Sequence, residues 1–340
     1  MKELVYPESL ASDILANAKA GMKTRQSLLI IINISIFVVL SILRPDAFAS
    51  WTNIKAILAL MSYDLLIAVA LTIVLIVRGI DLSVGSVLAL SSVTMALLMR
   101  ENVPIIPALI AGLGAALLCG LINGLLIAKA GIQPFLVTLG MMSVARGVAT
   151  ILTTGQYISF PNAAPWFTQF GRFEFHVSLG STSYGLPLLL ILSVVIISIL
   201  GSMLRYWPAL RWSLYVGESP DAAQLSGIKV ERLTITAYLI SALIVWIAAV
   251  LLTSANKIGY ANYGIGAELR ALAAAVVGGA SLSGGVGSIF GTFLGVLMLA
   301  LIGNGFVMLN GNPNWQQAMT GIVLIAAVGF DAIRTYGDRR

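Results

Sequence analysis

Charged side chains are scarce in this chain of 340 residues, where Asp, Glu, Lys and Arg together make up only 10%. A soluble globular domain carries about 25% charged residues. Because 59% of the residues are hydrophobic and the mean hydropathy is +0.96, there is too little polar surface to cover a globule in water. This composition excludes a soluble fold and makes the lipid bilayer the main solvent of the chain.

Cysteine and histidine are nearly absent, and the familiar catalytic patterns are missing. The single cysteine, Cys119, lies within an apolar run, which excludes a disulfide framework. The single histidine, His176, has no second His or Cys nearby, which argues against a zinc site. The chain contains no G-x-x-x-x-G-K-[ST], H-E-x-x-H or G-x-S-x-G pattern. Transport is therefore favoured over covalent catalysis, with no cofactor held by this chain.

Long apolar runs are what the sequence has instead. A transmembrane helix needs about 20 mostly apolar residues, whereas a membrane β-barrel shows short alternating segments. We therefore expect an all-α polytopic membrane protein with about ten transmembrane helices. The candidate spans are 27–43, 57–77, 83–99, 105–128, 134–153, 185–204, 234–255, 268–283, 287–310 and 316–333. Whether 268–283 crosses fully is left open, because it almost touches the next run.

Lys and Arg are distributed unequally over the loops, and this sets the expected orientation. With the N-terminus inside, 13 of the 20 basic residues fall on the cytoplasmic side and six outside. We expect a cytoplasmic segment at 1–26, one transmembrane domain at 27–335 and a cytoplasmic tail at 336–340. A cleaved signal peptide ending at Ala47–Ala49 is the alternative, but the charged region before the first run is too long for one. The basic residues form no cluster, which argues against nucleic acid as a partner.

Two loops are long. Residues 154–184 lie outside in this topology and predict a structured cap. The inside loop, 205–233, contains signals for a short helix: Ser219 suits the N-cap, Pro220 the first turn, and Gly227 the position just past the end. This helix is either an ordinary connection or a docking element for a cytoplasmic partner.

Ionisable groups within or at the ends of the spans are candidates for function, because charge in a bilayer is costly. Asp64 and Arg146 lie within spans, and Asp81, Glu268 and Arg270 lie at span ends. Arg146 must find a carboxylate, carbonyl groups or water. A pore-facing or helix-tying role is favoured, and the alternative is snorkelling of the side chain toward the lipid surface. Amides in the spans can bind a polyhydroxylated solute or join helices, and they are Asn123, Gln133, Gln156, Asn304, Gln316 and Gln317.

Small residues repeat every four positions in two runs, at 116–124 and 287–295, which predicts helices that pack closely. A weaker internal repeat matches 79–85 with 279–285 at an offset of 200 residues. Chance is one explanation, and equivalent turns in two halves of a transporter fold are the other.

Several motifs together resemble the permease subunits of ribose-type sugar ABC importers. The resemblance covers about residues 30–335 in the family's order. The stretches that carry it are Gly79–Ser86, Ile132–Met142, Ala145–Gly147, Asp221–Ile228, Glu268–Gly295 and Trp315–Gln317.

This resemblance implies the pathway subunit of an importer in the bacterial inner membrane, with a fold similar to that of vitamin B12-type importer permeases. A periplasmic binding protein would deliver a monosaccharide, and a cytoplasmic ATPase would bind ATP and Mg. A second permease subunit, identical or different, and membrane lipid complete the implied partners. The candidate coupling residues are Glu218, Ser219, Asp221, Ala222, Ala223, Leu225 and Gly227. The candidate pathway residues are Asp81, Asn123, Gln133, Phe135, Arg146, Glu268, Asn304 and Gln316.

Arg78 and Arg270 depart from the family pattern, which commonly has a small or polar residue at the first position and Asp at the second. They indicate a different sugar, a heterodimeric pair of permeases, or nothing about function. A nucleoside or polyol permease of the same architecture remains an alternative. A self-sufficient carrier or channel is a further one, disfavoured by the scarcity of mid-span carboxylates.

Overall fold

The computed structural model of the chain describes residues 25–179, 182–312 and 315–337. It is mostly helical, and by length and composition six of its helices can cross a membrane. These six are α2 (Arg25–Leu43), α3 (Trp51–Ile76), α5 (Ile105–Ala128), α6 (Pro134–Thr153), α11 (Val230–Asn256) and α13 (Ile289–Met308). The predicted segments 1–26 and 336–340 fall largely outside the described residues.

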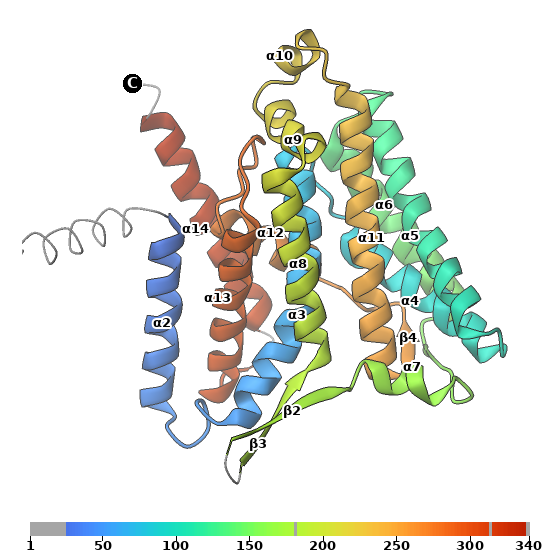
Figure 1. Cartoon of the computed structure of the whole chain (residues 1–340), viewed down its shortest axis with the longest axis vertical. Coiled ribbons are helices and arrows are strands. Elements are labelled where there is room, and N and C mark those ends of the chain that lie inside the picture. Colours follow the sequence, from blue (N-terminus) through green and yellow to red (C-terminus); the bar gives the residue numbers. More distant parts are fainter. Residues whose placement is uncertain (1–24, 180–181, 313–314, 338–340) are drawn as a thin grey trace, which may run out of the picture.

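The other helices are shorter or less apolar. They are α4 (Val84–Arg100), α7 (Pro165–Phe170), α8 (Leu188–Tyr206), α9 (Pro208–Glu218), α10 (Pro220–Leu225), α12 (Ala267–Val277) and α14 (Trp315–Gly337). In Figure 1 the bundle runs between two ends, with α10 at one and the hairpin of β2 (Glu174–Leu179) and β3 (Thr182–Pro187) at the other. We call these the α10 end and the hairpin end.

The eighth predicted span, 268–283, is broken, because only its first part is helical. Helix α12 ends at Val277 and has 11 residues, about 16 Å, roughly half of a bilayer core. Residues 257–266 precede it, with strand β4 (Ile258–Tyr260) packed along α4, since a Cβ on Gly259 would lie 2.8 Å from the Ser92 carbonyl oxygen. Residues 278–288 follow as a loop at the α10 end. The helix ends in a Schellman motif at Gly279, whose φ is +104°, and Gly284 and Gly285 also have positive φ farther along the loop.

The hairpin end contains the strands that an all-α fold leaves out. Strands β2 (Glu174–Leu179) and β3 (Thr182–Pro187) form an antiparallel hairpin, and β1 (Tyr157–Ser159) pairs antiparallel with β4. The described residues of the predicted cap at 154–184 are therefore structured, as expected. The β1–β4 pair supplies backbone hydrogen bonds to a stretch that has left the helical conformation.

Helix α3 forms the centre of the bundle. Its residues from Leu65 to Ile76 are all buried. In the most apolar 18-residue stretch of α3, 72% of the residues are buried, compared with 28% in that of α6. It packs against α8, α11, α12 and α13. The exposed face of α6 carries Leu136, Val144 and Ile151, which lie open in the isolated chain.

The predicted small-residue faces do bring helices together. A Cβ on Gly120 of α5 would lie 2.8 Å from the Tyr238 carbonyl oxygen of α11, and one on Gly295 of α13 would overlap the Ala274 carbonyl of α12. Only a residue without a side chain allows backbones to approach this closely, which is how membrane helices gain packing energy.

Candidate functional site: a polar cluster at the start of α4 and a surface at the α10 end

The predicted short helix in the inside loop is present as α10. The Ser219 side chain accepts a hydrogen bond from the Ala222 amide (3.3 Å), and Pro220 occupies the first turn. Gly227 has a φ of +80°, its amide donates to Gln224, and the Ile228 amide donates to the Ala223 carbonyl. These two bonds complete a Schellman motif, so the helix is closed at both ends by local chemistry.

Most residues of helix α10 are exposed. Ala223 is buried against the protein, whereas the Leu225 side chain is 91% exposed. Asp221 and Ala222 are exposed on the same short helix. A groove of about 950 Å³ runs beside it, lined by residues of α9, α10 and the start of α11, among them Trp212, Tyr215, Glu218, Lys229 and Arg232. Exposed aromatic and charged groups around a groove suit a protein partner.

Arg146 of α6 binds the non-helical stretch that precedes α12. Its Nη1 donates to the carbonyl oxygens of Ala261 and of Tyr263 (2.8 Å for the latter). Carbonyl groups outside a helix at membrane depth need a donor from another segment of the protein. Of the expected partners of Arg146, the structure shows backbone carbonyl groups. The guanidinium thereby connects α6 to the broken span.

Asp81 lies in a buried network at the beginning of α4. Its Oδ1 accepts bonds from the Ser83 amide (3.0 Å) and hydroxyl (2.6 Å), and Ser241 of α11 donates to its Oδ2 at 3.4 Å. Asn123 of α5 donates to the Ser83 hydroxyl (3.0 Å), and Tyr238 donates to the Ile80 carbonyl (3.1 Å). Within the described residues, Asn123 Oδ1 is buried with no hydrogen-bond partner.

Glu268 meets the same region from α12. Its Oε1 accepts a bond from the Gly266 amide (3.2 Å), and a Cβ on Gly85 would lie 2.7 Å from its Oε2. The first turns of α4 and α12 therefore lie close together, and a carboxylate between two helix N-termini is electrostatically favoured. Asp81, Asn123, Arg146 and Glu268 are thus gathered around the start of α4 and the segment 261–268.

The remaining predicted pathway residues lie elsewhere. Gln133 caps α6 at the α10 end and is exposed, as is Phe135 beside it (44%). Asn304 of α13 exchanges two amide hydrogen bonds with Asn53 of α3, at 2.8 and 3.0 Å. The side chain of Gln316 lies outside the described part of the chain.

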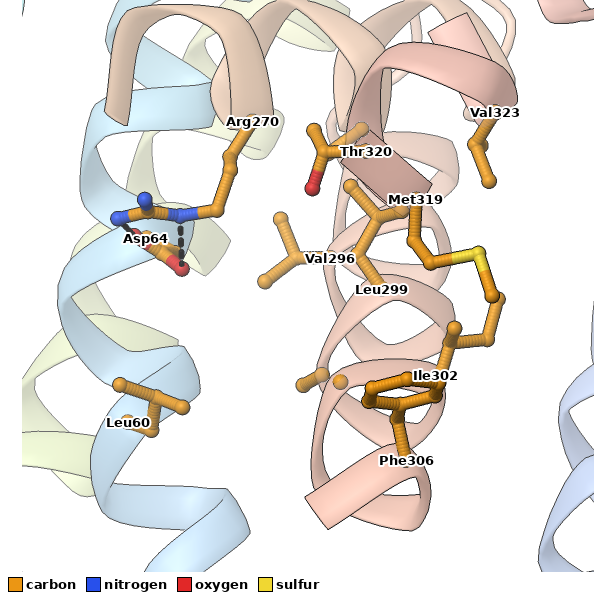
Figure 2. Close-up of a pocket in the computed structure, with 13 residues that line it drawn as sticks. Leu60, Asp64, Arg270, Val296, Leu299, Ile302, Phe306, Met319, Thr320 and Val323 are labelled. Atoms are coloured by element: carbon orange, nitrogen blue, oxygen red, sulfur yellow. Dashed lines mark hydrogen bonds and ion pairs between the residues drawn. The ribbon is translucent and has the colours of Figure 1, made fainter. Parts of the chain in front are cut away.

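Figure 2 shows an ion pair between Arg270 and Asp64, two residues that the sequence analysis treated separately. The Nε and Nη2 of Arg270 donate to the two carboxylate oxygens of Asp64 in α3, at 3.2 and 3.1 Å. The adjoining cavity, walled mainly by apolar residues of α13 and α14, holds only about 30 Å³. Ligand pockets measure about 300–1,000 Å³, so this cavity is not a sugar site.

Sequence reasoning missed the residues whose role depends on a distant partner. Asn53 precedes the apolar run that begins at 57, but Ser50 accepts a bond from the Asn53 amide and α3 starts at Trp51. Ser83 and Ser241 carry no signal of their own. Among the described residues, no three His, Cys, Asp or Glu side chains come together as a metal site.

Comparison with known proteins decides the family. A family model described as "Branched-chain amino acid transport system / permease component" matches residues 53–328. The chain belongs to this permease family. It is 37% identical over 294 residues to the ribose import permease of Bacillus subtilis (strain 168), covering 86% of this chain and 88% of that protein.

Two further relatives are named for the import or transport of other sugars. The fructose import permease of Rhizobium meliloti is 33% identical over 271 residues (78% of this chain, 74% of that protein). The L-arabinose ABC transporter permease of Azospirillum brasilense is 30% identical over 329 residues (96% and 94%). The resemblance to sugar ABC permeases is therefore confirmed, and the chain is an integral membrane protein. No solved structure gives a significant match.

Proposed function

We propose that this chain is the permease subunit of an ATP-driven importer that moves a monosaccharide delivered by a periplasmic binding protein. The observation that carries the proposal is similarity over most of the chain to proteins named for ribose, fructose and arabinose import. The chain itself catalyses no covalent step in this proposal, because ATP and Mg are bound by a separate ATPase.

The proposed topology has ten crossings in the bacterial inner membrane, with both termini and the α10 end in the cytoplasm. The six long helices, together with α4, α8, α14 and the broken span 257–277, make up these crossings. The excess of Lys and Arg in the loops of the α10 end supports this orientation. The single transmembrane domain 27–335, its coupling loop 205–233 and a fold like that of vitamin B12-type permeases belong to the same proposal.

The proposed pathway runs past the start of α4 and the exposed face of α6. Asp81, Asn123, Arg146 and Glu268 support this because they gather at one place in the bundle. Gln133 and Phe135 would line the cytoplasmic mouth, and the open face of α6 supports a second permease subunit that completes the path. The pairing of Asn304 with Asn53 favours a helix-joining role for that amide.

The α10 surface is the proposed contact for the ATPase. It combines an exposed two-turn helix, closed at both ends, with a groove large enough to receive side chains of a partner. Movement of a docked ATPase would then reach the bundle through α9 and α11, which flank α10.

The test is to purify the tagged chain from its native host in mild detergent and to reconstitute the preparation in liposomes. We expect an ATPase to co-purify, and ATP to drive uptake of D-ribose, D-fructose or L-arabinose when binding protein is supplied. Asp221→Arg should remove the ATPase from the preparation, since it reverses a charge on the docking helix. The matched control is Arg172→Glu, an equally exposed charge reversal at the hairpin end.

The substrate panel separates the alternatives. It includes nucleosides and polyols, and also branched-chain amino acids, because the description of the family model names them. Uptake of an amino acid alone would retain the importer and replace the sugar. A chain that purifies without an ATPase and transports without ATP would be a carrier or channel and would overturn the proposal.

A further inference from the structure

Three segments that are distant in the sequence meet at the α10 end. They are the end of α3 at 76–78, the end of α9 at 217–218, and the loop between α12 and α13 at 283–285, and we call this contact the junction. The Gly285 amide donates to the Ile76 carbonyl at 3.0 Å. A Cβ on Gly217 would overlap both of those groups, so only glycine allows the three backbones to meet.

The exposed side chain of Arg78 bridges the other two segments of the junction. Its Nε donates to the Ser283 carbonyl (2.8 Å) and its Nη2 to the Glu218 carbonyl (2.9 Å). One planar guanidinium therefore bridges the loop after α12 and the residue that leads into α10. A fork of fixed donors suits two acceptors at once, which a single ammonium does less well.

The backbone conformation of Arg78 indicates that this position is occupied by arginine for its side chain. Its φ is +62°, and it follows Val77, the C-cap of α3, at the position just past the cap where a helix commonly ends in glycine. A residue with a side chain pays a strain of about 1–2 kcal/mol in this conformation. An arginine where glycine fits best points to a role for the guanidinium rather than for the turn.

The loop 278–288 is held together by its own hydrogen bonds and is connected to α12. Within it the Ser281 amide donates to the Val286 carbonyl (3.0 Å) and the Gly284 amide to the Ser281 carbonyl (3.2 Å), so it is closed on itself. One end continues into α12, which carries Glu268 and the pair between Arg270 and Asp64. A shift at the junction is therefore connected directly to the polar cluster at the start of α4.

We infer that Arg78 is the positioning residue that couples the docking helix to the broken span, making α9 and the loop 278–288 one moving unit. This inference rests on the proposed function, since it assigns a route from the ATPase surface to the pathway. It also explains why this chain has arginine at position 78, where the family commonly has a small or polar residue: the side chain bridges α9 and the loop.

The first test is Arg78→Gly in the purified ATPase complex. Glycine keeps the left-handed turn and removes only the bridge, so expression and thermal stability should not fall. We expect ATP hydrolysis to remain within about twofold, while D-ribose imported per ATP falls by about five- to tenfold. The control is Lys257→Gly, another basic residue with positive φ (+59°) at a helix end, on the opposite side of the bundle. An unchanged ratio of uptake to hydrolysis in Arg78→Gly would overturn the inference.

The second test needs no transported substrate. Spin labels at Arg211 on α9 and Val286 in the loop, both exposed, are introduced in a Cys119→Ala background. With Arg78 present, their separation should stay constant between the nucleotide-free and ATP-bound complexes, and Arg78→Gly should broaden or shift it. A separation that changes with ATP in the presence of Arg78 would show that α9 and the loop move independently. If the wild-type complex imports no sugar, the proposed function fails while this distance still reports on the junction.

Discussion

Helix α3 and the broken span 257–277 lie side by side, yet they cross the bundle in different ways. Helix α3 runs unbroken for 26 residues and satisfies its own backbone, so its buried half needs almost nothing but Leu, Ile, Val and Ala. The broken span has helix over only 11 residues, and elsewhere its backbone depends on β1 and on Arg146.

The difference shows where polar side chains are needed in a membrane protein. In lipid an unpaired backbone group costs several kcal/mol, so a segment that leaves the helix must be met by donors and acceptors from elsewhere. Arg146 and Glu268 follow this rule, because Arg146 donates to the carbonyls of Ala261 and Tyr263 and Glu268 accepts from the Gly266 amide. The polar cluster is thus inseparable from the break in the helix.

The largest effect is expected from removing the donor to the broken span. Arg146→Ala leaves the carbonyls of Ala261 and Tyr263 without the guanidinium, and hydrogen bonds to a charged group contribute about 1.5–3 kcal/mol. We expect a lower apparent melting temperature in detergent and loss of uptake in the reconstituted complex. Arg146→Lys should recover part of both, because it returns one charged donor.

The matched control for Arg146 is Arg172→Ala. Arg172 also donates to a backbone carbonyl, that of Ala255 (2.6 Å), but it is exposed at the hairpin end. Water can replace it there, so the expected change in stability is within about 0.5 kcal/mol. Equal losses in the two variants would contradict the special requirement of the broken span.

An intermediate effect is expected at the ion pair that joins the two crossings. Asp64 and Arg270 have side chains 23% and 33% exposed, between a surface pair and a fully buried one. Either single change, Asp64→Leu or Arg270→Met, should destabilise the protein by about 1–3 kcal/mol, because it leaves the other charge without its partner. The double variant should be more stable than either single one, since no charge is left.

A double-mutant cycle on thermal or denaturant midpoints measures this coupling directly. If the double variant simply adds the two single losses, the pair does not link α3 to α12. The exchanged variant, Asp64→Arg with Arg270→Asp, provides a further check, because it keeps the attraction and changes only its direction.

Local chemistry explains what the sequence could predict. The helix at 220–225 was predictable because Ser219, Pro220 and Gly227 each act within a few residues of their own position. The break in the eighth span was not, since 268–283 is apolar enough to pass for a helix. What ends the helix is Gly279, whose φ is +104° just past Val277. The arginine on α6 binds the non-helical backbone that precedes α12.

The candidate site divides in the same way. Arg146 stood out because charge in an apolar run is conspicuous, and its need for carbonyls, a carboxylate or water followed from its type alone. The identity of its partners depended on a contact 117 residues away. Asp64 and Arg270 were each visible as charges, but 206 residues separate them and no local pattern joins them.

The smallest effect is expected within the continuous helices, at the amide pair between α3 and α13. Hydrogen bonds between membrane helices average about 0.6 kcal/mol, and Asn53 keeps its bond to the Phe48 carbonyl when Asn304 is replaced. Asn304→Leu should therefore lower stability only slightly and leave uptake within about twofold of wild type, with Asn53→Leu as its partner control. If Asn304→Leu abolished uptake at unchanged stability while Asn53→Leu did not, Asn304 would face the pathway as the sequence predicted. Polar contact with the solute would then extend beyond the broken span, and the contrast between the two crossings would no longer locate the site.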